Sequence, residues 1–85
     1  MNRPWVAIQR NPTSGSGKNR SMLFDLIARL KHHSLVPRLF ARREKLARAI
    51  QEPEARQHLV CIVAAGGDGT LGDVINRYPD VPVAV

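Results

Sequence analysis

The chain has 85 residues, of which 44% are hydrophobic, and this length allows one small domain, or part of one, with a modest core. Its single cysteine, Cys61, excludes an internal disulfide and favours a reducing, cytosolic location, and no apolar run approaches the ~18 residues of a membrane span. The net charge of +6 is concentrated in residues 1–58, whose 12 basic and 4 acidic side chains suit phosphorylated ligands, nucleic acid or an anionic lipid surface.

The first predicted elements are a strand, a loop and a helix. Trp5–Gln9 is a short apolar run that predicts a strand and ends at Asn11-Pro12. Pro12–Gly17 consists almost wholly of turn residues and predicts a loop. A helix is predicted from about Ser21 to His33, because its apolar residues fall on one stripe at helical spacing: Met22, Leu23, Leu26, Ile27 and Leu30.

The middle of the chain predicts two strands with helical segments between them. Leu35–Ala41 contains a strand, and Arg43–Gln51 predicts a helix. The inward-facing residues of this helix are Leu46, Ala49 and Ile50. Pro53 restarts a short helical turn, since proline is acceptable at a first helical position. Leu59–Ala65 is apolar throughout, as expected of a parallel strand covered on both faces.

The last predicted elements are a turn, a helix and a strand. Gly66–Thr70 predicts the turn, Leu71–Arg77 the helix and Val81–Val85 the strand. The helix should face inward with Leu71, Val74, Ile75 and Tyr78. The order β-α-β-α-β-α-β predicts an α/β fold, a three-layer Rossmann-like parallel sheet with helices on both faces. Because no predicted element covers the last strand, we expect an incomplete domain, the front part of a longer protein.

Two loops rich in glycine and serine follow the first and third predicted strands: Asn11–Lys18 and Gly66–Thr70. In an open parallel sheet, ligands bind outside the carboxyl ends of the strands. Glycine lets backbone N–H groups approach an anion closely, and each loop opens a helix whose N-terminus favours negative charge. The two loops together therefore predict a phosphate site.

Neither loop is explained by a common nucleotide motif. Gly17-Lys18 fits the middle of a Walker A loop, but Pro12 stands where the first glycine is needed and Asn19 where Ser or Thr is needed. Gly67–Gly72 fits Gly-x-Gly-x-x-Gly, but it lies in the third strand–helix turn, and the acidic ribose partner expected ~20 residues on falls beyond the chain. A Walker A site is excluded, and the dinucleotide fingerprint is weak.

Asp68 is the unusual member of the second loop. A carboxylate among phosphate-binding glycines would repel a phosphate unless a cation lay between them. Asp68 therefore suits contact with a metal ion, a hydroxyl or an ordered water. Alternatively, it bonds its own backbone in the glycine turn.

Two motifs in these loops resemble those of one family. With Asn11-Pro12-Thr13-Ser14-Gly15 and Gly66-Gly67-Asp68-Gly69-Thr70, the chain resembles the diacylglycerol kinase catalytic family, which includes sphingosine kinases and bacterial lipid kinases and shares a fold with NAD kinases. Asp73 stands where the family usually has Glu. Phe40–Lys45 lacks the threonine and the His-Ala pair that the family often has there, so the contacts of that region and the acceptor stay open.

The resemblance implies a kinase that binds ATP and Mg²⁺ between the two loops and transfers phosphate to a lipid hydroxyl, such as that of diacylglycerol or a sphingoid base. It assigns nucleotide contacts to Asn11, Ser14, Gly15, Gly66, Gly67, Gly69 and Thr70. It makes Asp68 the catalytic residue, acting on the metal directly or through water. The family's Gly-Thr-x-Asn motif and its second, mainly β domain are absent from residues 1–85. We therefore expect the N-terminal part of the nucleotide-binding domain, inactive by itself.

Two other functions stay open, a NAD kinase-like enzyme and a non-catalytic module that binds nucleotides or anions. We expect a cytoplasmic protein with no nucleic-acid partner. The basic run Arg38–Arg48 could contact an anionic membrane or ATP, but its pattern favours a solvated helix face. Asp73, near a helix start, suits the helix dipole, and His32 and His33 suit a helix end.

Overall fold

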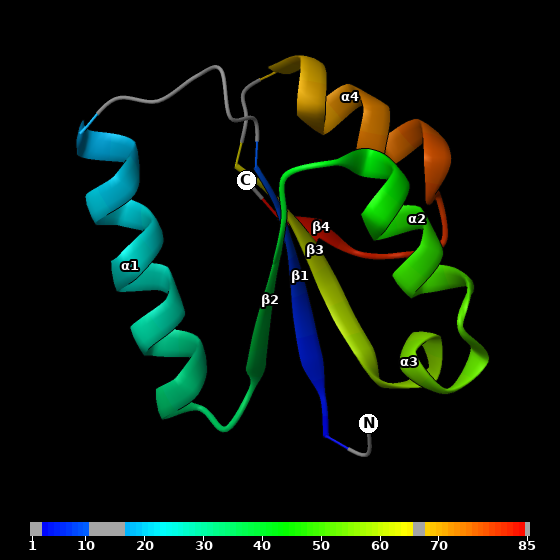
Figure 1. Cartoon of the computed structure of the whole chain (residues 1–85), viewed down its shortest axis with the longest axis horizontal. Coiled ribbons are helices and arrows are strands. Elements are labelled where there is room, and N and C mark those ends of the chain that lie inside the picture. The colour runs from blue at the N-terminus through cyan, green and yellow to red at the C-terminus, as the bar shows by residue number, and fades with distance from the viewer. Residues whose placement is uncertain (1–2, 11–16, 66–67, 85) are drawn as a thin grey trace.

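The computed structural model describes residues 3–10, 17–65 and 68–84, and they form a parallel four-stranded sheet with helices on both faces (Figure 1). The elements are β1 (Trp5–Arg10), α1 (Gly17–His32), β2 (Val36–Phe40), α2 (Arg43–Gln51), α3 (Pro53–His58), β3 (Leu59–Ala65), α4 (Asp68–Arg77) and β4 (Val83–Ala84). The strands lie in the order β2-β1-β3-β4. The predicted α/β class is confirmed.

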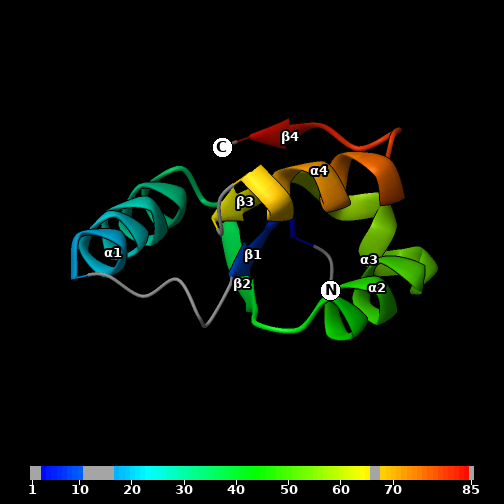
Figure 2. The ribbon, with the colours of Figure 1, turned by 90° about the horizontal axis from the view of Figure 1, so that it is seen from above.

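β1 lies between β2 and β3 and is buried on both faces of the sheet. Successive side chains of a strand point to opposite faces, so Trp5, Ala7 and Gln9 share one face and Val6 and Ile8 the other. Figure 2 shows α1 on one side of the sheet and α2, α3 and α4 on the other. The chain thus changes faces between its first and its later helices.

The main hydrophobic core lies between the sheet and α2, α3 and α4. Its centre is Trp5, which is fully buried and whose indole N–H donates a hydrogen bond of 2.6 Å to the carbonyl of Ala55. Around it pack buried side chains of strands, of helices and of the connection between α4 and β4: Ala7, Phe40, Leu46, Ile50, Ile62, Val74 and Val81. Leu46 and Ile50 confirm the predicted inward face of α2, with Ala49 packed partly against the core.

The face that carries α1 is less completely covered. In the predicted apolar stripe of α1, Leu23, Leu26, Ile27 and Leu30 are half-buried. Met22 is 70% exposed, so the prediction that it belongs to this stripe is wrong. The reason is that α1 contacts the sheet mainly along the edge strand β2. A helix at an edge buries a narrower stripe than one over the centre of a sheet.

β3 also differs from its prediction. Ile62 and Ala64 are buried towards α2 and α4, whereas Cys61 and Val63 on the α1 side are only half-buried. The uniformly apolar sequence of β3 predicted that other elements would cover both of its faces. In the described part of the chain, only the face towards α2 and α4 is fully covered. The bounds of β3 and of α2 are as predicted.

Three other bounds are corrected. α1 begins at Gly17 and not near Ser21, because the low helix propensity of Gly17 and Asn19 hides its start. α4 begins at Asp68 and not at Leu71, and β4 is confined to Val83–Ala84 within the described residues. No helix in the described ranges is long and apolar enough to cross a membrane.

Candidate functional site

The carboxyl ends of β1 and β3 lie side by side, and the two glycine-rich segments of the sequence follow them. The two strands pair in parallel as far as Arg10 opposite Ala65. The chain therefore leaves the sheet at adjacent positions on its way to α1 and to α4 (Figure 1). Because α1 and α4 then run on opposite faces (Figure 2), this is the switch point where open α/β sheets bind their ligands.

The predicted site residues divide into two groups. The following ones lie outside the described residues: Asn11, Ser14, Gly15, Gly66 and Gly67. Asp68, Gly69 and Thr70 form the first turn of α4, at the edge of the sheet just defined. This corrects the predicted turn 66–70, whose last three residues are helical. The first N–H groups of a helix have no intrahelical acceptor and carry partial positive charge, so the helical conformation also suits an anion there.

Gly69 and Gly72 leave one face of α4 without side chains. They are three residues apart and therefore neighbours on the helix surface. A Cβ atom built on either would meet nothing within 4 Å, and neither has a φ in the left-handed region. Neither packing nor backbone conformation within the described chain therefore requires glycine, although glycine weakens a helix. A bare backbone is what close approach of a ligand requires.

Asp73 connects α4 to the start of α2. Its Oδ1 lies 3.0 Å from Nε of Arg77 on the same helix and 3.6 Å from Nη1 of Arg43. Its side chain is 34% exposed. Because Asp73 is the sixth residue of α4, the suggested role at a helix start is wrong, and an ion pair between helices replaces it. Arg43 was not predicted as a site residue, because its only signal in the sequence is its place in a basic run.

Gln9 is a second residue that the analysis of the sequence missed. It is 6% exposed and lies one residue before the end of β1. Its Nε2 donates to the carbonyls of Arg10 and Phe40 at 3.0 and 3.2 Å, which fixes the orientation of the amide. Its Oε1 is buried and has no hydrogen-bond partner in the described chain. A polar residue at the end of an apolar run, two residues before the Asn-Pro motif, was the available signal.

Two side chains near the core have shifted pKa values. Burial raises the pKa of the half-buried Cys61 thiol, so its neutral form is favoured. Burial also raises the pKa of Tyr78, an effect that Arg77 opposes and Asp73 reinforces, so its hydroxyl is a donor at neutral pH. Among residues 3–10, 17–65 and 68–84, no group of three or more His, Cys, Asp or Glu side chains is arranged to hold a metal ion.

Comparison with known proteins gave one family and two curated relatives. The family model for the diacylglycerol kinase catalytic domain matches residues 6–85. Two proteins named diacylglycerol kinase, from Staphylococcus aureus strains bovine RF122 / ET3-1 and MRSA252, are each 35% identical over 74 residues. The alignments cover 85% of this chain and 23% of each relative, so the chain spans about a quarter of their length. No solved structure gave a significant match.

Proposed function

Because the chain belongs to the diacylglycerol kinase catalytic domain family, we propose that it forms part of the ATP site of a lipid kinase. The observation that carries this proposal is the pairing of β1 and β3 up to Arg10 and Ala65. Arg10 and Ala65, which directly precede the two motif segments in the sequence, therefore lie opposite each other at the switch point of the sheet. One polyphosphate chain can then contact both segments.

The first turn of α4 supplies what a phosphate group needs. In the proposed complex, backbone N–H groups of Gly69 and Thr70 donate to phosphate oxygens, and the bare face at Gly69 and Gly72 allows the close approach. Phosphoryl transfer depends mainly on positioning and on neutralising charge, not on covalent chemistry by the protein. Contacts from Asn11, Ser14, Gly15, Gly66 and Gly67 complete the proposed nucleotide site.

Asp68 is the proposed contact to Mg²⁺, directly or through water. The described residues hold no three-ligand cluster, which fits an ion held by one or two carboxylates, waters and phosphate oxygens. When bound, Mg²⁺ would neutralise charge on the phosphates of ATP. Asp68 would hold the ion, directly or through a water molecule. In this proposal, residues that correspond to the unaligned part of the curated relatives bind the lipid acceptor.

The experiment is a phosphorylation assay of the full-length gene product with labelled ATP, Mg²⁺ and a lipid extract. We expect a labelled lipid, with diacylglycerol and sphingoid bases tested singly to identify the acceptor. NAD⁺ in a parallel reaction tests the NAD kinase alternative. Absence of any labelled lipid would overturn the proposal.

Asp68 is tested in the same assay. Asp68→Ala and Asp68→Asn should each lower kcat by at least about 100-fold, while the urea midpoint of unfolding changes little, since loss of a helix-dipole contact alone is worth only about 0.3–1 kcal/mol. If Asp68 only stabilises α4, the two variants retain near-normal kcat.

A further inference from the structure

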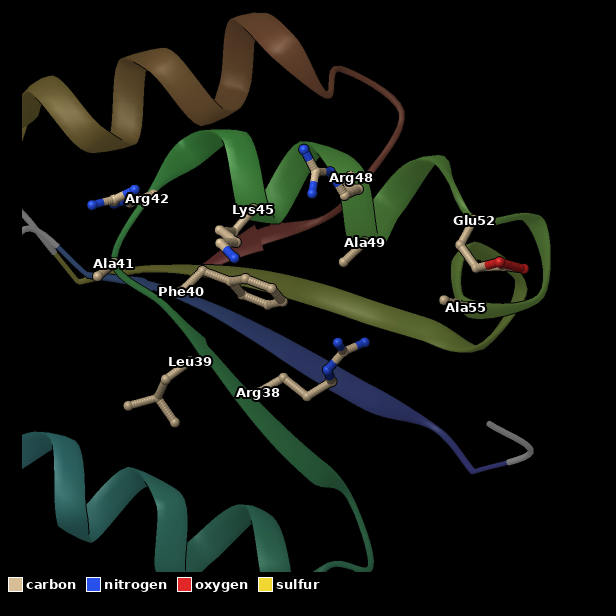
Figure 3. Close-up of a pocket in the computed structure, with 10 residues that line it drawn as sticks. All are labelled: Arg38, Leu39, Phe40, Ala41, Arg42, Lys45, Arg48, Ala49, Glu52 and Ala55. Atoms are coloured by element: carbon tan, nitrogen blue, oxygen red, sulfur yellow. The ribbon is translucent and has the colours of Figure 1, made fainter.

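A cavity of about 770 Å³ lies along the β2 edge of the sheet, between β2, α2 and the start of α3 (Figure 3). Its apolar wall includes Phe40, Ala49 and Ala55. Its charged residues are Arg38, Arg42, Lys45, Arg48 and Glu52. The volume is in the range of sites for small organic ligands. Its lining carries four positive charges and one negative charge.

The positive side chains of this cavity have no acidic partner in the described chain. The ion pairs found there use other arginines: Arg29 with Asp25, Arg43 and Arg77 with Asp73, and Arg56 with Asp80. Lys45 and Arg48 are three residues apart, so they are neighbours on one face of α2, where like charges destabilise a helix. No acidic side chain of the described elements offsets these charges, and an external anion would.

Arg38 is held in place before any ligand arrives. Its guanidinium carbon lies 4.9 Å from the ring centroid of Trp5 and 5.4 Å from that of Phe40. Trp5 is fully buried and Phe40 is 8% exposed, so both rings are fixed by the core. These cation–π contacts restrain the side chain, and the N–H groups of the guanidinium form a fork that matches two phosphate oxygens. Less side-chain freedom is then lost on binding.

We propose that this cavity is a second anion site, which binds a phosphorylated ligand through Arg38, Lys45 and Arg48. Figure 3 shows Arg38 on β2 and Lys45 on α2 approaching the Phe40 ring from two sides, with Arg42 turned away at the start of α2. Glu52 stands at the other end, beside α3, and suits a hydroxyl or ammonium group of the same ligand. The site goes beyond the ATP site proposed above, because that site rests on the loops after β1 and β3.

The phosphate group can belong to a soluble metabolite or to a lipid headgroup, and the experiment separates the two. The soluble probe is inorganic tripolyphosphate, titrated calorimetrically into the full-length gene product that has been saturated with a non-hydrolysable ATP analogue. The lipid probe is sedimentation with phosphatidylglycerol vesicles, compared with phosphatidylcholine vesicles. Saturation with the analogue occupies the proposed ATP site, so any remaining binding belongs elsewhere.

The cavity variant is Lys45→Gln/Arg48→Gln, and the matched control is Arg29→Gln/Lys31→Gln on α1. Both variants remove two exposed positive charges from a helix surface. We expect the cavity variant to bind at least one probe at least about tenfold more weakly, because it loses charge-assisted hydrogen bonds, while the control binds like the parent. Arg38→Lys keeps the charge but loses the planar fork, and it should weaken the same probe by a smaller factor.

Each outcome of the two titrations has a definite meaning. Weaker tripolyphosphate binding alone assigns a soluble phosphate, and weaker binding to phosphatidylglycerol alone assigns a headgroup. The proposal is overturned if the parent binds neither probe, or if the cavity variant binds both as well as the control does. If the ATP analogue does not bind, the result counts against the proposed ATP site. The two probes are then measured without the analogue and still test the cavity.

Discussion

Replacing Gly69 by alanine should stabilise the fold and weaken nucleotide binding at the same time. The added Cβ meets nothing within 4 Å, and the residue is already helical, so the folded state has no new clash. Glycine is about 0.5–1 kcal/mol worse than alanine in a helix, and a first-turn position should give the lower part of that range. The expected gain in unfolding free energy is therefore about 0.5 kcal/mol. A methyl group on the bare face, however, occupies the space that a phosphate would need.

The assay measures both quantities on one preparation of the full-length gene product, the urea midpoint for stability and equilibrium titration with an ATP analogue for binding. We expect a higher midpoint for Gly69→Ala and a dissociation constant raised by at least about tenfold, equal to about 1.4 kcal/mol. Gly72→Ala is the matched control: its Cβ is equally free of contacts, but it lies one turn further from the helix start. It should gain similar stability and lose less affinity. Unchanged affinity in Gly69→Ala would refute the argument that glycine is there for a ligand.

Three further outcomes follow from the contacts of the fold. A double-mutant cycle on Arg43→Ala and Asp73→Ala should give a coupling of about 0.2–1 kcal/mol in urea unfolding, because both side chains are partly exposed; a value near zero would contradict the link between α2 and α4. Trp5→Phe should lower stability by about 1–3 kcal/mol, since it removes the buried hydrogen bond to Ala55, and a loss below about 0.5 kcal/mol would show that this bond contributes little. Burial raises the pKa of Cys61, so the contribution of its neutral thiol to stability is complete below about pH 8.5 and decreases as pH rises towards the folded-state pKa. The urea midpoint of the parent should therefore fall more steeply from about pH 8 to 10 than that of Cys61→Ala. Equal slopes would contradict this.

Some elements could be predicted because their local signals agree. α2 and β3 have the predicted bounds, since an amphipathic helix between breakers and a uniform apolar run each have one clear interpretation. The start of α4 was missed because glycines at positions 66, 67 and 69 suggested a turn, whereas an acidic residue at a helix start favours a helix there. Ile75 was expected to face inward but is 48% exposed, because spacing along a helix does not say how wide its covered face is.

The candidate site was predicted in kind but not in arrangement. The motifs pointed to phosphate binding, yet nothing local shows that β1 lies between β2 and β3, or that Arg10 lies opposite Ala65. The link from Arg43 to Asp73 and the open acceptor of Gln9 also depend on tertiary packing. Such contacts join residues that are far apart in the sequence, and periodicity carries no information on them.

The position of Trp5 has a consequence for synthesis of the protein. Its hydrogen-bond partner, Ala55, is 50 positions further along the chain, and β1 has no partner on its β3 side until Leu59–Ala65 has been made. At about 5–20 residues per second, the ribosome needs several seconds to deliver these residues. During that interval β1, whose residues Trp5–Gln9 are buried in the folded protein, lacks its neighbour β3. The N-terminal strand should therefore be a binding site for chaperones during translation, and Trp5 its principal contact.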